Sequence, residues 1–175
     1  MFGPHERLED GTLVFASPIE NGHVPIIALR DIGFFARYSF DNRALVSGKD
    51  LQVASDWVGW DYLVETFTKV TGKKAVYVHQ PFDEWVKGFD GADGPIANER
   101  SFGDGSTTWK ENFRSWWNMW HDDLHKRDFE WLRKVNPKGY TLESWMRETG
   151  YTGDVDGRLL KNAEDGKTPK YQYKA

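Results

Sequence analysis

The sequence predicts an α+β fold in which a few short strands pack with about six helices. Two observations support this prediction: short β-like runs bounded by Gly, Pro and Asn, and longer runs in which apolar residues recur with helical spacing. With 175 residues, 39% of them hydrophobic, the chain is large enough to bury the core of one domain. Residues 1–153 are therefore predicted to form a single domain.

Four segments are predicted to be strands: residues 12–17, 24–29, 50–54 and 75–79. The first run stops at Pro18, and Asn21-Gly22 then signals a turn. Strands this short, separated by helical patterns, predict small sheets that helices cover.

Helices are predicted over residues 32–41, 60–71, 81–88, 108–124, 128–135 and 141–147. The first helix is predicted to begin after Asp31 as its N-cap, and the others begin at an Asp, Gly, Pro or Thr. The clearest start signal is the capping box from Thr108 to Glu111. In the first helix, Ile32, Phe35, Ala36 and Phe40 are predicted to face inward. Residues 88–107, rich in Gly, Asp, Asn and Ser, are predicted to be a flexible loop or lid, and 154–175 a polar tail.

Composition excludes several partners. The net charge of −4 and the lack of a long basic run argue against nucleic acid, and no apolar run approaches the ~18 residues that span a membrane. The N-terminus lacks the pattern of a signal peptide, and the absence of cysteine excludes disulfides and thiolate metal sites. These features predict a cytoplasmic protein that binds neither nucleic acid nor membranes.

Several stretches, in order, line up with one family. They are Val24 to Gly33 with its Asp31-Ile-Gly, Gly48 to Ser55, Phe67 to Tyr77 with Thr71-Gly-Lys, and the tract from Trp116 to Gly153. Together they resemble the C-terminal, substrate-side half of fungal NmrA-like proteins, which are atypical short-chain dehydrogenases/reductases. The resemblance implies a fold that derives from a truncated Rossmann parent. The family's Gly-rich turn and nicotinamide-facing residues lie in a half with no counterpart here, so no cofactor and no cofactor-binding residue is predicted.

Two motifs are rejected as ligand sites. The glycines from Gly88 to Gly94 have a GxxGxxG spacing, but a helix is predicted before them and Pro95 follows, so they are not predicted to bind a dinucleotide. His121 and His125 are four residues apart, yet no third ligand is evident and a solvated helix end is preferred. No metal is predicted.

One helical stripe is unusually rich in tryptophan. Large planar side chains bury much area and also line pockets for flat ligands. The predicted substrate-binding residues are therefore Trp109, Phe113, Trp116, Trp117 and Trp120, although a packed core is the commoner use of such a stripe. The candidate acid/base groups are His121 beside this stripe, His79 at a strand end, and Asp128.

Three functions stay open at this point. The first is a cofactor-independent tailoring enzyme, of the isomerase, cyclase or dehydratase class, acting on an aromatic or polyketide-like metabolite. The second is a fragment or subunit of an NAD(P)-dependent NmrA-like oxidoreductase, and the third is a non-catalytic binding or regulatory module. Without the parent sheet an apolar face would be exposed, and we expect a homodimer or the aromatic-rich helices to cover it.

Overall fold

The computed structural model of the chain describes residues 3–96, 104–153 and 170–171. Within them the fold is mixed α+β, with helices and short strands in small sheets, as predicted. The strands are β1 (Glu6–Arg7), β2 (Leu13–Ser17), β3 (Val24–Ile26), β4 (Asp56–Val58), β5 (Ala75–His79), β6 (Phe89–Asp90) and β7 (Lys170–Tyr171). The helices are α1 (Leu29–Asp41), α2 (Arg43–Val46), α3 (Trp60–Thr71), α4 (Phe82–Trp85), the 3-10 turn η1 (Val86–Gly88), α6 (Trp109–His121), α7 (Phe129–Val135) and α8 (Leu142–Thr149).

The main sheet has three strands in the order β1-β2-β5. β1 runs antiparallel to β2, whereas β5 is parallel to β2 in a register that pairs Leu13 with Ala75 and Ser17 with His79. All five residues of β2 are buried, which is typical of a central strand covered on both faces. Two small antiparallel ribbons, β3-β4 and β6-β7, complete the strands of the described part.

Three helix ends lie at residues whose local chemistry predicts them. The Thr108 hydroxyl accepts from the Glu111 backbone N–H at 3.1 Å while Glu111 reaches back, so the predicted capping box at α6 is confirmed. Thr141 caps α8 in the same manner, and Gly72, in the left-handed conformation at φ 71°, ends α3. No helix of the described residues is long and apolar enough to cross a membrane.

The predicted strand at residues 50–54 is wrong. The Val53 N–H bonds back to the Leu51 carbonyl at 2.8 Å, which bends the segment, and the ladder with β3 starts only at Ser55. The strand is therefore β4, paired so that Val24 lies opposite Val58. The alternation of Leu51 and Val53 therefore predicted the strand several residues too early in the chain.

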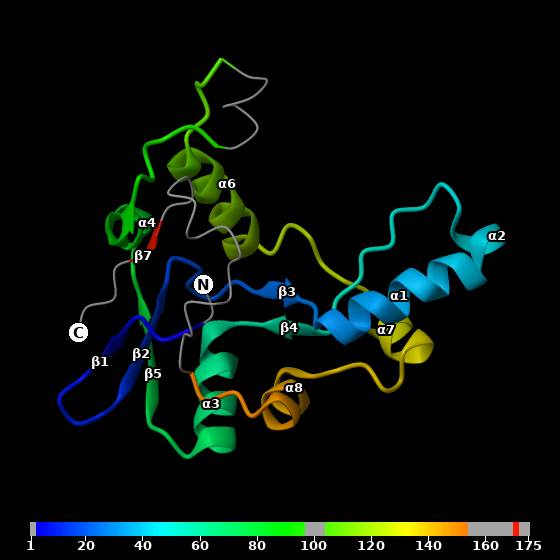
Figure 1. The fold of residues 1–175 in the computed structure, drawn as a ribbon, viewed down its shortest axis with the longest axis horizontal. Coiled ribbons are helices and arrows are strands. Elements are labelled where there is room, and N and C mark those ends of the chain that lie inside the picture. Colours follow the sequence, from blue (N-terminus) through cyan, green and yellow to red (C-terminus); the bar gives the residue numbers. More distant parts are fainter. Residues whose placement is uncertain (1–2, 97–103, 154–169, 172–175) are drawn as a thin grey trace.

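The core forms two clusters of unequal size. The larger lies between the main sheet, α3, α4, α6 and α8, and its fully buried side chains include Trp60, Trp85 and Trp117. The smaller holds Phe35 of α1 against Ala54 and Leu132 of α7. Figure 1 shows the consequence: α1, α2 and α7 lie together at one end of the molecule, and the β3-β4 ribbon leads from them to the main sheet.

The inward face predicted for the first helix is largely wrong. Phe35 is 5% exposed, but Ile32 is 45% and Phe40 83% exposed, and Ala36 is exposed as well. α1 therefore presents the apolar side chains of Ile32, Ala36 and Phe40 to solvent, while Phe35 beside them is packed. The aromatic-rich α6 does not cover that side, because its rings pack into the larger cluster.

Parts of two predicted segments lie outside the described residues. These are 97–103 of the predicted lid and 154–169 and 172–175 of the predicted tail. Within the described part, residues 89–90 of the former pair with residues 170–171 of the latter as an antiparallel ribbon.

Candidate functional site

The candidate site lies at the carboxyl ends of the parallel strands β2 and β5. Ser17 and His79 are paired at this edge, and the turn with Glu20 follows β2. In Figure 1 both strands run toward α4 and α6 at this end. Ligands of α/β sheets bind outside the carboxyl ends of parallel strands, so polar groups gathered here are candidates for chemistry.

Glu20 is held in a backbone conformation that glutamate disfavours. Its φ is 53°, inside a turn closed by the Gly22 N–H, which donates to the Ile19 carbonyl at 3.0 Å. The Tyr77 hydroxyl accepts from the Glu20 N–H at 3.0 Å and donates to the Ser17 carbonyl at 3.2 Å. A left-handed non-glycine residue costs about 1–3 kcal/mol and persists only where its surroundings enforce it. The hydrogen bond to the Tyr77 hydroxyl is one of the contacts that hold Glu20 in this conformation.

His121 lies between two carboxylates. Its Nε2 is 3.0 Å from Glu20 Oε2, and its Nδ1 is 2.7 Å from Asp122 Oδ1. A ring that donates from both nitrogens carries both protons, so this geometry describes an imidazolium ion. The hydrogen bonds to Asp122 and then Glu20 raise the pKa of His121 above its usual value of 6.5.

The pKa of Glu20 is shifted in the opposite direction to that of His121. The hydrogen bond from His121, followed by the charge of nearby His79, lowers the pKa of the Glu20 carboxyl. Both partners are half-exposed, His121 at 43% and Glu20 at 52% of the side chain, so a ligand from solvent can reach them. The pair is a charged acid and a charged base in contact.

Gly22 allows the β2 turn to touch the end of α6. A Cβ on Gly22 would lie 2.3 Å from the Trp120 carbonyl oxygen and 2.5 Å from the Cα of His121. Both are backbone atoms that cannot move without moving the helix. The absence of a side chain at Gly22 therefore sets the separation at which Glu20 reaches His121.

A second histidine–carboxylate pair joins the turn after β2 to the end of α6. In this pair the histidine lies on the turn and the carboxylate follows the helix. His23 follows the turn, and its Nδ1 is 3.1 Å from Asp123 Oδ2 while its ring stacks on Trp57. The His23 N–H also donates to Asp123 at 2.9 Å. Each segment thus supplies one histidine and one acceptor to the other, which fixes the turn on α6 at two points.

The end of α6 explains why Asp123 is in place and why the two-histidine spacing fails. The N–H groups of Asp123 and Leu124 bond to the carbonyls of Trp120 and Met119, and Asp123 has φ 49°. This is a Schellman termination with aspartate at the left-handed position. The helix therefore ends at His121 rather than near residue 124, and His125 lies beyond it against the Trp120 ring.

The predicted acid/base residues fall into two groups. The structure brings His121 into contact with Glu20, and the charge of His79 lowers the pKa of the same carboxyl. Asp128 instead caps α7, where its carboxylate accepts from the Trp131 N–H at 2.9 Å. The geometry of Asp128 is that of an N-cap, and no described hydrogen bond links it to either histidine.

The predicted substrate-binding stripe divides by burial. Trp117 and Trp120 are 1% and 7% exposed and belong to the larger core cluster. Trp109, Phe113 and Trp116 are half-buried at its margin, and the Trp109 and Phe113 rings stack with centroids 4.0 Å apart. The indole N–H groups of Trp117 and Trp120 are buried and find no acceptor among the described residues.

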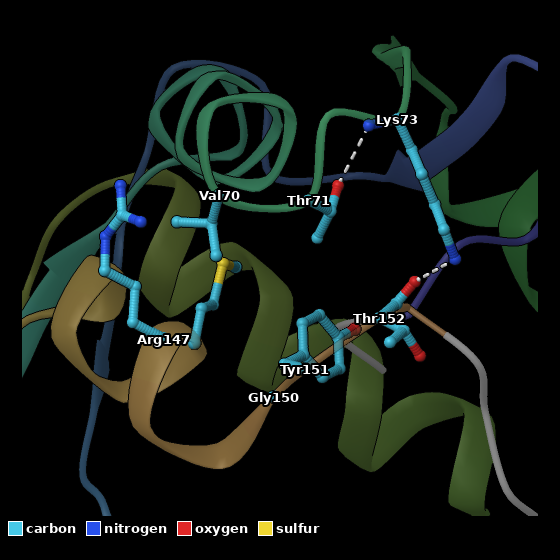
Figure 2. A pocket seen from close by; sticks show the side chains of 8 residues that line it. Val70, Thr71, Lys73, Arg147, Gly150, Tyr151 and Thr152 are labelled. Carbon is cyan, nitrogen blue, oxygen red and sulfur yellow. Dashed lines mark hydrogen bonds between the residues drawn. The ribbon is translucent and has the colours of Figure 1, made fainter.

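An open surface cavity of about 360 Å³ lies elsewhere, between the ends of α3 and α8 (Figure 2). Its lining residues are Val70, Thr71, Lys73, Met146, Arg147, Gly150, Tyr151 and Thr152. None of the predicted site residues is among them. Lys73 Nζ donates to the Thr152 carbonyl at 2.9 Å, and Arg147 pairs with Glu143 at 2.9 Å, so both nearby cations are engaged. We therefore place the candidate chemistry at the histidine cluster rather than here.

The rejected motifs have plain structural positions. Gly88 ends η1 and Gly91 lies in a turn after β6, so a strand–turn–helix for a dinucleotide is absent from residues 86–96. Among the side chains that the structure describes, no three histidine or acidic groups are arranged to hold a metal ion.

Sequence reasoning missed Glu20, Asp122 and Tyr77. Glu20 stands 101 positions from His121, and no local pattern joins residues so far apart. One signal was available: Glu20 comes directly after a strand that ends at the sheet edge where ligands bind. The acidic pair after His121 was a second signal, because a carboxylate beside a histidine orients its ring.

Compared with models of known protein families, the chain matches none, and compared with curated protein sequences it has no significant match.

Proposed function

We propose that this chain is an acid–base enzyme of the isomerase, cyclase or dehydratase class that acts on an aromatic or polyketide-like small molecule without a nicotinamide. The observation on which the proposal depends is the contact of Glu20 and His121, a carboxylate base and an imidazolium acid 3.0 Å apart. Such a pair can remove a proton from one atom of a substrate and return one to another.

The surroundings assign a role to each group. Glu20, with its lowered pKa, stays ionised and accepts the proton, while His121 donates from Nε2 as charge develops on a substrate oxygen. Asp122 orients the ring through Nδ1 and maintains its charge. The charge of His79 also lowers the pKa of Glu20, which makes His79 the second candidate acid. Proton transfer by a positioned group contributes about 10²- to 10⁴-fold.

The half-buried rings of Trp109, Phe113 and Trp116 support the choice of substrate class. They lie on α6, the helix that ends at His121, and offer flat apolar surface at the margin of the core.

A model substrate tests this proposal before the natural one is identified. In 5-nitrobenzisoxazole, a base removes the ring C–H proton, the N–O bond breaks, and the product is a coloured phenolate that an acid can protonate. We expect the chain to accelerate this elimination and Glu20→Gln to abolish the acceleration. Glu65→Gln, which changes an exposed carboxylate on α3, is the matched control and should keep the wild-type rate. Equal rates for the wild type and Glu20→Gln would refute the assignment of the base.

The pH profile separates the two partners. Because the pKa of Glu20 is lowered and that of His121 raised, the rate should hold over a broad plateau that extends above pH 6.5. Asp122→Asn removes the carboxylate that raises the pKa of His121 most. The alkaline limb of the pH–rate profile should therefore move to lower pH. An unmoved limb would show that His121 is not the acid.

The second candidate, a subunit of an NAD(P)-dependent oxidoreductase, is favoured by the exposed apolar side chains of α1, among them Leu29 at 86% and Phe40 at 83% exposure. This reading also follows from the resemblance to NmrA-like proteins, which stays a prediction. Calorimetric titration with NADPH and NADH discriminates: saturable binding would favour the oxidoreductase, and elimination activity without binding would favour the acid–base enzyme.

A further inference from the structure

The exposed side of α1 carries a continuous apolar surface. Leu29, Ile32, Gly33, Ala36 and Phe40 stand at positions i, i+3, i+4, i+7 and i+11 of α1, so they lie on one side of the helix, which we call the α1 stripe. All five are exposed, Leu29 at 86% and Phe40 at 83%. A Cβ on Gly33 would meet no atom within 4 Å.

Among the residues that the structure describes, α1 is packed on the side of Asp31 and Phe35. Phe35 faces Ala54 and Leu132, and this cluster is much smaller than the main core. Among the described residues nothing covers the α1 stripe, and Figure 1 shows α1 and α2 projecting at the end of the molecule. Contiguous exposed apolar side chains of this kind mark an interaction surface.

We propose that the α1 stripe is the interface of a homodimer in which two α1 helices pack antiparallel about a two-fold axis. Along the centre of the stripe the order is large, small, small, large: Leu29, Gly33, Ala36, Phe40, with Ile32 at the edge nearest Phe35. Turning a second copy about a point midway between Gly33 and Ala36 places its Phe40 against Leu29 and its Ala36 against Gly33. A surface that fits its own rotated copy is what an isologous interface requires.

The charges beside the stripe fit the same arrangement. Arg30 and Asp41 lie on one flank, near opposite ends of α1, and both are exposed. The two-fold operation keeps each flank on its own side, so it brings Asp41 of the second copy next to Arg30 at both ends of the interface. Their present partners, Glu148 for Arg30 and Arg37 for Asp41, lie outside the stripe and need not be displaced.

The size of the stripe predicts a weak dimer. A helix of 13 residues is about 20 Å long. One pair of such helices buries less than the roughly 1,600 Å² of a standard stable interface. Association should therefore depend on concentration, with a Kd on the order of micromolar.

Sedimentation velocity over a concentration series tests the interface. The wild type should shift from monomer to dimer between about 1 and 100 μM. Phe40→Asp should stay monomeric over that range, whereas Leu124→Asp, at a position 66% exposed but outside the stripe, should dimerise like the wild type. A wild type that stays monomeric throughout would overturn the proposal and leave the stripe to a different polypeptide. A dimer that persists in Phe40→Asp would overturn it too.

A single cysteine tests the geometry, because the chain has none of its own. In the proposed pairing the two copies of residue 36 are offset by three residues, about 4.5 Å along the axis, within reach of a disulfide. Oxidised Ala36→Cys should form a covalent dimer, and Glu65→Cys on α3 should not. Equal cross-linking of both variants would exclude a specific α1 contact. These readouts are independent of the proposed catalysis.

Discussion

Gly22→Ala is the sharpest test of how the candidate site is built. The new Cβ would lie 2.3 Å from the Trp120 oxygen and 2.7 Å from that of His121, so the β2 turn must move away from α6. Movement breaks the hydrogen bonds from the His23 N–H to the Trp120 carbonyl and the Asp123 carboxylate. Adding the overlap to two lost bonds, we expect a loss of about 3 kcal/mol in the free energy of unfolding.

Urea unfolding followed by tryptophan fluorescence measures this loss, and imidazole NMR measures its effect on the site. In Gly22→Ala the pKa of His121 should fall toward 6.5, because the contact with Glu20 opens. Gly33→Ala is the control, since its Cβ meets nothing within 4 Å and alanine favours a helix. At low protein concentration the free energy of unfolding of Gly33→Ala should equal that of the wild type or exceed it by about 0.5–1 kcal/mol. A Gly22→Ala protein within 1 kcal/mol of the wild type and with an unchanged His121 would refute the close-contact argument.

Three further predictions concern His5, Asp31 and Glu20. Burial, with a smaller effect of the N-terminal amino group, lowers the pKa of His5 from 6.5 to about 4, so only the unfolded chain takes up a proton between these values. Stability should therefore fall by about 3 kcal/mol from pH 6.5 to pH 4, and His5→Asn should flatten this loss in urea titrations. Asp31→Ala leaves the buried Ser55 hydroxyl, the Asn136 amide and the Tyr140 N–H without their acceptor, and should cost about 3–5 kcal/mol in the same assay. Asp83→Ala, which breaks an exposed pair, should cost below about 1 kcal/mol; equal losses would contradict the role of Asp31. Glu20→Gly should match or exceed the wild type in thermal unfolding while losing elimination activity, because glycine relieves the left-handed backbone; a clear loss of stability would argue against strain there.

Local patterns predicted the elements whose signals are complete within a few residues. The capping box at Thr108, the helix stop at Gly72 and the strand before Pro18 depend on neighbours in sequence, and all three are confirmed. The end of α6 was harder, because a Schellman termination with Asp123 in place of glycine gives a weak sequence signal.

Tertiary contacts decided the rest. Asp31 was predicted as an N-cap, yet α1 starts at Leu29 and the Asp31 carboxylate instead joins Ser55, Asn136 and Tyr140, up to 109 positions away. Apolar spacing likewise showed that α1 has apolar residues on more than one side without showing which side meets Leu132.

By itself the sequence determined an α+β chain with capped helices and short strands, and it offered His79, His121 and Asp128 as candidate acid/base groups. Only the tertiary structure supplied Glu20 as the carboxylate that His121 contacts and both histidines affect, and only it showed the α1 stripe exposed. The physical reason is the range of the interactions. Caps and periodicity depend on residues within about four positions, whereas the Glu20–His121 contact depends on how a strand and a helix 101 positions apart are packed.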